Sequence, residues 1–364
     1  MSGVVGTIDR FQQRHPRASV PLAVAYKFFD DQGNYLAATL SYYTFIAVFP
    51  LMLLGTSILG FVLEGRPHLR DRILDSALST FPIIGDQLGR PEGLRGSTTG
   101  VVVGALAALY GTLGLGQALQ NTMAVAWSIP RNSRPNPILI RLKSLLLLVT
   151  AGGALLTVSI VSTIASTTEA FGSTLDAGVR ALLPLITVLV VGAALTLLFR
   201  VAAAHDHSLA RAAPGAFALA VMWQGLQYAG AAYVRHVLVD TSAMNQTFGL
   251  VLGLVGFIYI GAVMAVVAME INVVLARKLY PRALLTPFTD RVRLTHADRR
   301  AYTSYARAQR HKGFERVAVS FDNGERTNGS PAEEPGTEPA TEQTAEPTAD
   351  DTTPEPNRPA GDDA

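Results

Sequence analysis

The chain of 364 residues is 49% hydrophobic and only 16% charged, with a formal net charge of +2 and no cysteine. Soluble domains carry about 25% charged residues, so this composition excludes an ordinary soluble enzyme. The missing cysteine excludes disulfides, thiolate catalysis and thiolate-ligated metal centres. Apolar residues instead fall in blocks of about 20, the length with which an α-helix crosses a bilayer. The sequence therefore predicts an all-α polytopic membrane protein.

Six long segments, in which Glu270 is the one charged residue, predict six transmembrane helices. The first block is too long, and begins too far into the chain, to be a cleaved signal peptide. Residues 1–35 are expected to be an N-terminal segment and residues 36–282 the transmembrane domain. The predicted spans are Leu36–Leu63, Thr98–Leu119, Ser144–Ala165, Ala181–Phe199, Ala216–Tyr233 and Phe248–Leu275.

The connections between these spans predict that both termini are cytoplasmic. Six crossings put the termini on one side of the membrane, together with loops 120–143 and 200–213. Counted as far as residue 293, that side holds 15 Lys and Arg residues, against seven on the opposite side. An excess of positive charge marks the cytoplasmic side. In the largest external loop, 64–97, a stretch around Ile73–Phe81 has the spacing of an amphipathic helix, either lying at the outer interface or capping the bundle.

The end of the chain differs in composition. Residues 322–364 hold 12 acidic residues, two basic residues and seven prolines without an aromatic side chain, which predicts a disordered acidic tail. The preceding residues carry 28 basic and 16 acidic side chains, a net charge of +12. Residues 283–321 are expected to be a basic juxtamembrane segment attracted to anionic membrane lipids. No recognisable nucleic-acid-binding module accompanies this charge, so the tail region is expected to contact protein partners and not nucleic acid.

Polar side chains within two spans repeat at helical spacing and so share one face of each helix. Polar groups are costly in lipid, and both stripes are predicted to face the interior of the bundle. They are candidates for a solute pathway or for helix packing. The residues are Tyr110, Gln117 and Asn121 in the second span, and Gln224, Gln227 and Tyr228 in the fifth.

The first span carries Tyr42 and Tyr43 near its start and Pro50 near its middle. Proline removes a backbone hydrogen bond and is expected to kink the helix. The kink has two interpretations, a solute path beside the polar stripes or a structural bend.

Glycines in two spans have the spacing that lets helix backbones approach closely. Gly100 and Gly104 form one such pair in the second span. Gly249 and Gly253 form another in the sixth, where Gly256 continues the same face. All are expected to be helix-packing positions.

Glu270 is the most specific candidate for a functional group, because an acid inside a span needs a partner. One interpretation is a proton or cation site within the bundle. The other is a salt bridge to Lys143, Arg277 or Lys278 at the interface. Asn272 is predicted to lie on the opposite face, among the headgroups.

The sequence lacks the residue patterns typical of a hydrolase or an ATPase. Hydrolysis of phosphate esters needs converging acids, bases or metal ligands, yet the seven histidines are scattered and only His205, Asp206 and His207 are clustered. A Walker phosphate loop is missing. We therefore expect neither an enzyme nor a bound metal or cofactor.

Several stretches resemble the YihY/BrkB family of bacterial inner-membrane proteins, once mislabelled ribonuclease BN. They are LAATLSYYTFIAVFPL from Leu36, NTMAVAWSIPRNSR from Asn121, Pro214-Gly215-Ala216, and FGLVLGLVGFIYIGAVMAVVAMEIN from Phe248. The resemblance covers about residues 22–282, although Phe257 and Ile258 stand where the family usually has a tryptophan.

The resemblance implies a multi-pass protein of the bacterial inner membrane that supports envelope integrity. Two functions remain open. The first is a transporter or flippase for a lipid-like or amphiphilic solute, with membrane lipids as partners. The second is a non-transporting scaffold for envelope assembly.

Overall fold

The computed structural model describes residues 12–62, 98–170, 177–203, 208–233, 243–283 and 294–321. These residues form helices and connecting turns without a strand, which confirms the all-α prediction for the described part. The chain divides into two units, Met1–Asn323 and Gly324–Ala364, and every described residue lies in the first. The predicted amphipathic loop 64–97 and the predicted acidic tail 322–364 lie outside the described residues.

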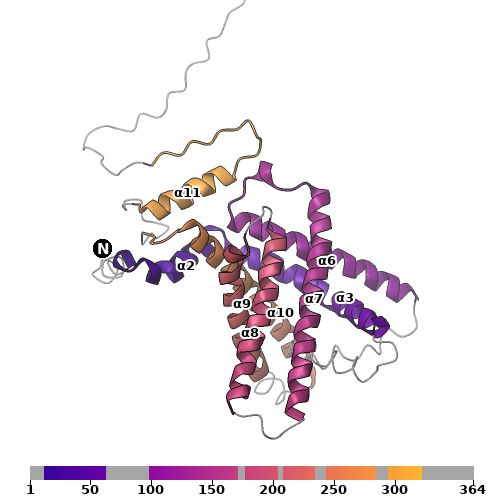
Figure 1. Ribbon diagram of the computed structural model, residues 1–364. Helices are drawn as coiled ribbons and strands as arrows, with labels where there is room; N and C mark the ends of the chain where they lie inside the picture. Colours follow the sequence, from indigo (N-terminus) through magenta and orange to yellow (C-terminus); the bar gives the residue numbers. More distant parts are fainter. Residues whose placement is uncertain are drawn as a thin grey trace, which may run out of the picture. The chain divides into compact units, whose positions relative to one another are not determined.

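Each predicted span coincides with one long helix (Figure 1). A short helix precedes the first of them and another follows the last. The long helices are α3 (Gly33–Val62), α6 (Thr98–Ala126), α7 (Pro137–Ala170), α8 (Ala177–Ala202), α9 (Leu209–Tyr233) and α10 (Ala243–Arg277). The short elements are the 3-10 turns η1 (Pro16–Ser19) and η3 (Arg131–Ser133) and the helices α2 (Val20–Asp30) and α11 (His296–Ala308).

Local sequence determines where several helices begin and end. The Asn136 side chain accepts a hydrogen bond from the Leu139 amide at 2.8 Å, just before Pro137 opens α7. At the ends of α6 and α10, Ser128 and Lys278 adopt left-handed backbone conformations with φ of 47° and 53°. Paired backbone bonds close the last turn of each helix, from Ile129 to Ala124 in α6 and from Leu279 to Val274 in α10. This is the Schellman pattern, in which glycine usually occupies the left-handed position.

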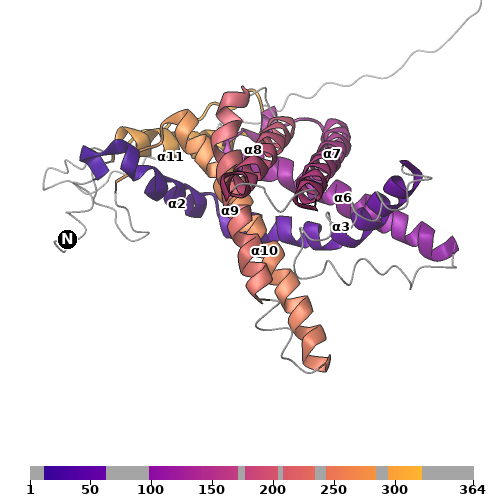
Figure 2. The same ribbon diagram turned by 60° about the horizontal axis from the view of Figure 1, so that its bottom comes forward.

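Helix α10 lies at the centre of the packing (Figures 1 and 2). It contacts α2, α3, α6 and α9. Helix α3 also packs along α6, and α8 lies between α7 and α9. Val266, Met269 and Val273 of α10 are completely buried. The apolar residues of this one helix therefore hold several neighbours together through burial of hydrocarbon surface.

The outer surface of the long helices is apolar. Leu146 and Val149 of α7, Leu189 of α8 and Leu252 of α10 are all largely exposed. Large apolar patches on a surface mark contact with a membrane or with another protein. By length and composition, two stretches in the described residues are able to span a membrane, Leu185–Ala202 and Val251–Arg277.

Candidate functional site

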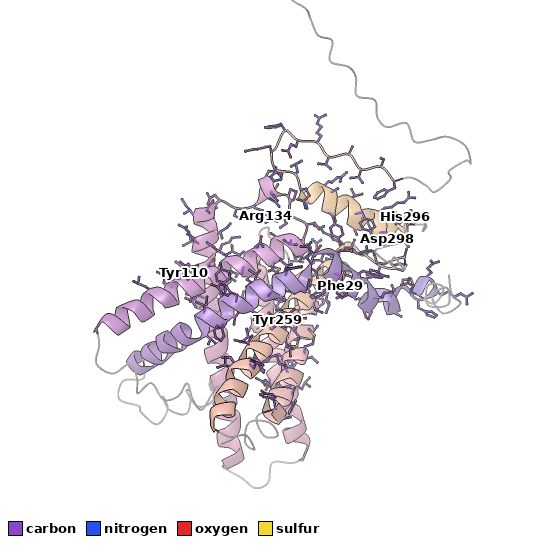
Figure 3. The ribbon with its side chains drawn as sticks, turned by 180° about the vertical axis from the view of Figure 1, so that it is seen from behind. Phe29, Tyr110, Arg134, Tyr259, His296 and Asp298 are labelled. Atoms are coloured by element: carbon purple, nitrogen blue, oxygen red, sulfur yellow. The ribbon has the colours of Figure 1, made fainter. Side chains whose placement is uncertain are left out.

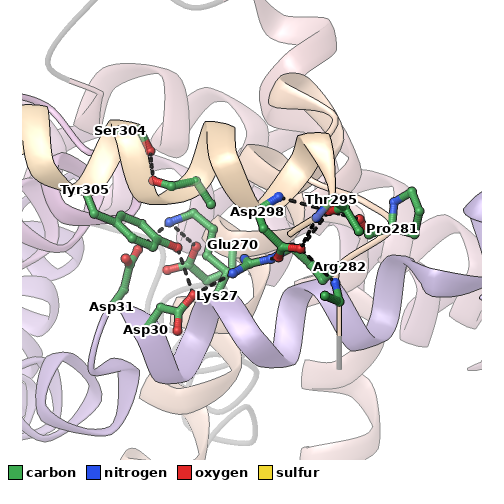
Figure 4. A network of polar contacts seen from close by, with 12 residues as sticks. Lys27, Asp30, Asp31, Glu270, Pro281, Arg282, Thr295, Asp298, Ser304 and Tyr305 are labelled. Atoms are coloured by element: carbon green, nitrogen blue, oxygen red, sulfur yellow. Dashed lines mark hydrogen bonds and ion pairs between the residues drawn. The ribbon is translucent and has the colours of Figure 1, made fainter. Parts of the chain in front are cut away.

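A buried set of charges joins α2 to α10 (Figure 4). The ammonium group of Lys27 lies 2.5 Å from Asp31 Oδ2 and 3.3 Å from Glu270 Oε2. Lys27 and Asp31 are four residues apart, so the last turn of α2 brings them together. Glu270 is 0% exposed, and its carboxylate oxygens accept no hydrogen bond from the described residues. Its contact with Lys27 is thus electrostatic, without the geometry of a hydrogen bond.

A second cluster fixes the segment that follows α10. Arg282 is 1% exposed, and its guanidinium donates to Asp298 Oδ1 at 2.5 Å and to Asp30 Oδ2 at 3.2 Å. Asp298 Oδ2 also accepts from the Ala283 amide at 2.9 Å. Thr295 and Asp298 form a capping box, in which each side chain accepts from the other's backbone amide. Asp298 therefore caps the first turn of α11 and joins this helix to the segment that follows α10.

Aromatic rings connect the two clusters. The hydroxyl of Tyr305 lies 3.3 Å from Asp30 Oδ2, and Lys27 Nζ lies 5.1 Å from the centre of its ring. Arg282 contacts the rings of Tyr26 and Tyr302 at 5.8 Å and 5.5 Å. Cation–π contacts of this kind are strongest when the cation is desolvated, as both are.

We call the charged members of these clusters the ionic network. With every group ionised, it would hold two cations and four carboxylates. Burying unbalanced charge is costly, so the excess of acid favours protonation of a buried carboxyl. The ionic network consists of Lys27, Asp30, Asp31, Glu270, Arg282 and Asp298.

The electrostatics outside the long helices agree with this imbalance. Burial raises the pKa of Asp31, and the nearby Lys27 opposes the shift only in part. Burial also raises the pKa of the Tyr305 hydroxyl. For Arg282, burial alone would lower the pKa, but the hydrogen bond and charge of Asp298 raise it above its ordinary value. Arg282 therefore remains charged, whereas Asp31 takes up a proton more readily than an exposed aspartate.

A buried amide braces α9 against α10. Pro214 lies inside α9 and interrupts its backbone hydrogen bonds. Asn272 of α10 bonds the backbone on either side of this proline: its side chain accepts from the Gly215 amide at 2.7 Å and donates to the Ala212 carbonyl at 3.0 Å. A methyl group on Gly215 would collide with the Ala268 carbonyl and with Asn272. The two helices therefore touch backbone to backbone at this glycine.

An apolar pocket of about 280 Å³ lies between the long helices. Its walls include residues from α3, α6, α7, α8, α9 and α10. Gly261 and Ala262 of α10 leave space there, and Trp223 of α9 packs edge-on against Phe257 at 5.7 Å between ring centres. Ala151 of α7 lies at its exposed rim. We refer to this space as the apolar pocket.

A second hollow of about 310 Å³, with several polar side chains in its wall, adjoins it along α6. Gly116 lines the apolar pocket, and the next residue, Gln117, lines the polar hollow. Arg134 donates from Nη1 to Asn121 Oδ1 at 2.9 Å, while its buried Nε has no hydrogen-bond partner among the described residues. Burial, assisted by the charge of Arg131, lowers the pKa of Arg134. We refer to this space as the polar hollow.

Residues 24–291 match the family model described as virulence factor BrkB. The chain belongs to the BrkB family. This confirms the resemblance found in the sequence and identifies a membrane protein, as the two apolar helices also indicate. No curated protein and no solved structure matches the chain. The match includes Lys27, Glu270 and Asn272 of this BrkB-family protein, whereas α11 lies beyond its end.

Glu270 forms a salt bridge, as one of the two interpretations predicted, but with a partner not considered. The carboxylate pairs with Lys27 of α2, and not with Lys143, Arg277 or Lys278. The prediction for Asn272 was wrong. Its side chain is buried against α9, because the amide forms hydrogen bonds with the Gly215 amide and the Ala212 carbonyl of that helix.

The prediction that the second-span stripe faces inward was also wrong for its polar members. Tyr110, which Figure 3 labels, is 64% exposed. Gln117 and Asn121 are exposed as well. The buried polar residues of α6 lie on other positions, Gln120 and Thr122 among them. Gln120 donates to the Ile140 carbonyl and to Ser144 Oγ, both at 3.0 Å, and so joins α6 to α7.

The other candidate pathway residues are distributed over partly exposed surfaces. Tyr228 of the fifth-span stripe is 64% exposed, contrary to the predicted inward orientation, while Gln224 and Gln227 are half-buried. Tyr42 of the first span is 57% exposed. Tyr43 is half-buried beside Gly114 of α6. Pro50 lies within α3, but its surroundings are outside the described residues.

The predicted helix-packing glycines fill different roles. Gly253 accommodates the ring of Tyr233 from α9, whose hydroxyl donates to the Gly249 carbonyl at 3.0 Å. Gly256 faces open space. Gly100 and Gly104 lie in α6, but their surroundings are not among the described residues. The close backbone approach to α10 occurs instead at Gly215 of α9, beside the Ala268 carbonyl.

Two signals in the sequence could have revealed the ionic network. Lys27 and Asp31 have the i, i+4 spacing of a helical ion pair. Thr295 and Asp298 have the spacing of a capping box, which marks the start of α11. Within the described residues, no three His, Asp or Glu side chains are arranged to hold a metal ion.

Proposed function

We propose that this BrkB-family protein is a transporter or flippase that moves a lipid-like or amphiphilic solute and so supports envelope integrity. The observation that carries the proposal is the apolar pocket, whose walls come from six long helices. Ligand sites are typically apolar hollows with a few polar groups beside them. A pocket shared by so many helices changes shape when any of them moves.

The adjoining polar hollow supports an amphiphilic solute in particular. Gly116 and Gln120, one turn apart on α6, line the two spaces, so a hydrocarbon chain and its polar head would occupy neighbouring turns. Arg134 brings a positive charge and an unsatisfied Nε–H to the polar side. Neither space carries a set of groups suited to catalysis, and we propose no enzymatic activity.

We further propose that all six long helices cross the bacterial inner membrane, with both termini in the cytoplasm. The positive charge of the connections and the apolar surfaces of α7, α8 and α10 support this arrangement. It would place the ionic network and α11 on the cytoplasmic side. Because the chain has no native cysteine, a single introduced cysteine reports on its side without interference.

Impermeant maleimide labelling of intact cells tests this topology. The His236→Cys variant should react from outside, and the Lys312→Cys variant only after the membrane is permeabilised. Labelling of the first variant from the cytoplasmic side alone would contradict the proposed arrangement.

Reconstitution into liposomes tests transport. Fluorescent phospholipid in the inner leaflet should become accessible to an impermeant reductant when the full chain is present. Ala151→Phe places a ring at the rim of the apolar pocket and should abolish most of this flux. Ala193→Phe makes the same change on an exposed position of α8 outside the pocket and is the matched control.

Equal flux from both variants would remove the apolar pocket from the pathway. If the wild-type chain gave no more flux than empty liposomes but retained a protein partner through purification, the scaffold function would replace transport.

A further inference from the structure

We propose that this protein has a binding site for a phosphate group where α6 and α10 end against α11. The site is separate from the apolar pocket and does not depend on transport. It is a hollow of about 590 Å³, here called the arginine pocket. Its lining includes Ser128, Arg277, His296, Arg299, Arg300 and Arg307.

Four arginines line the arginine pocket, and no acidic residue does. Arginine is the side chain best suited to phosphate, because its planar guanidinium donates two parallel hydrogen bonds. A concentration of guanidinium groups without a carboxylate is electrostatically unfavourable until an anion enters. The chemistry of the lining therefore selects an anion with several oxygen acceptors.

Two of the guanidiniums are held in place by neutral partners. Arg277 donates to the Trp127 carbonyl at the end of α6 and lies over the Trp127 ring at 5.7 Å. Arg300 donates to the Lys278 carbonyl at the end of α10. Each guanidinium has five N–H donors, so one bond to a carbonyl fixes its position and leaves others for a ligand. Such preorganisation lowers the entropy lost on binding.

Ser128 is an independent observation that points to a ligand. It is 8% exposed, and its hydroxyl has no hydrogen-bond partner among the described residues. Its backbone is left-handed, at the Schellman position where glycine is preferred. Serine therefore occupies a place that glycine would fill with less strain, and its side-chain hydroxyl remains unsatisfied. Unsatisfied groups and strained backbone occur together at binding sites.

Binding of radiolabelled inorganic phosphate to the detergent-solubilised full chain, measured by equilibrium dialysis, tests the proposal. Arg307→Gln should weaken binding about tenfold, the loss expected for one charge-assisted hydrogen bond. Arg310→Gln is the matched control, since Arg310 contacts Asn132 outside the arginine pocket. Equal weakening by both variants would mean a diffuse charge effect and would overturn the proposal.

Ser128→Gly separates a binding role from a structural role. Glycine relieves the left-handed strain, so the melting temperature should stay the same or rise. Phosphate binding should nevertheless weaken several-fold, because the hydroxyl is lost. Unchanged phosphate binding in this variant and in Arg307→Gln would overturn the proposal.

A phosphate group could come from a free anion or from a lipid headgroup, and vesicles distinguish the two. Trp127 lies beside the pocket, so its fluorescence in a Trp223→Phe background reports on binding, because the chain has two tryptophans. A change in phosphatidylcholine vesicles that contain phosphatidic acid, without a change on adding inorganic phosphate, identifies the headgroup. The reverse identifies a free phosphate. No response to either, together with no binding in dialysis, would exclude the site.

Discussion

The ionic network and the apolar pocket share α10 but are built in opposite ways. At the end of α10, Glu270 and Asn272 are completely enclosed and hold α2 and α9 through charge and hydrogen bonds. About two turns earlier, Gly261 and Ala262 leave an open space among hydrocarbon side chains. Directional polar contacts fix a geometry, whereas apolar contacts tolerate sliding. We infer that one end of α10 is rigid and that the middle adapts to a solute.

The largest expected effect comes from removing a charge at the rigid end of α10. Lys27→Met leaves Asp31 and Glu270 buried without a cation, which should destabilise the fold by about 3–5 kcal/mol. Glu270→Gln instead leaves Lys27 paired with Asp31 and balances the charge, so its stability should stay near that of the wild type. The stability of both variants is measured by thermal unfolding in detergent, with size-exclusion chromatography as the readout. A Glu270→Gln variant as unstable as Lys27→Met would contradict the claim that the ionic network carries an excess of acid.

The Glu270→Gln variant also sharpens the assignment of function. If it accumulates and melts normally but transports no solute, the carboxyl group takes part in transport beyond its structural contact. Normal transport in this variant would limit Glu270 to joining α2 and α10.

The next effect concerns the contact between α9 and α10. Gly215→Ala should destabilise the fold by about 1–3 kcal/mol, because the added methyl group has no room beside Ala268. Gly256→Ala adds the same group to α10 in open space and should be neutral or slightly stabilising. Their melting temperatures in one detergent provide the comparison. Similar values for the two variants would show that the helices do not approach closely at Gly215.

A smaller effect is expected at α11. Thr295→Ala removes one half of the capping box and should cost about 1 kcal/mol. The loss should be local, so hydrogen exchange should accelerate in α11 before it accelerates in α10. Faster exchange throughout both helices would indicate that α11 is required for the whole bundle.

The smallest expected effect is a change in how the stability of the fold depends on pH. The pKa of Asp31 is raised in the folded protein, so the folded state binds a proton more tightly than the unfolded state. The contribution of this group to stability is therefore complete below its ordinary pKa of 3.8 and is lost as the pH rises through the raised value. Asp31→Asn should remove this component. Melting temperatures of the wild type and of Asp31→Asn across acidic and neutral pH test whether Asp31 contributes less to stability as the pH rises. Parallel profiles of the two proteins would contradict this.

Sequence reasoning identified the long helices well, because apolar runs of membrane length are a strong and local signal. Each predicted span overlaps one long helix of the structure, and the first extends one residue beyond the end of α3. Periodicity was less informative about orientation. The face of α6 that packs on α3 is marked by small residues, since Gly111 lies against the Ala47 backbone and Gly114 against the ring of Tyr43. The polar stripe only partly overlapped that face, and helical spacing alone does not say which face is covered.

Spacing rules reach only the Lys27–Asp31 pair and the capping box at Asp298, because the other contacts of the ionic network join residues that are distant in sequence. Arg282 and Asp30 are separated by most of the chain, as are Lys27 and Glu270. Lys27 and Arg282 were counted only as positive charges that orient the helices in the membrane. Tertiary packing gave them another role, since both side chains are buried.

The most direct test of the account is the lipid content of the purified protein. Mass spectrometry of co-purifying lipids should find an amphiphile retained by the wild-type chain and by Ala193→Phe, but depleted in Ala151→Phe at unchanged melting temperature. Equal retention by all three proteins would contradict the claim that the apolar pocket receives the solute.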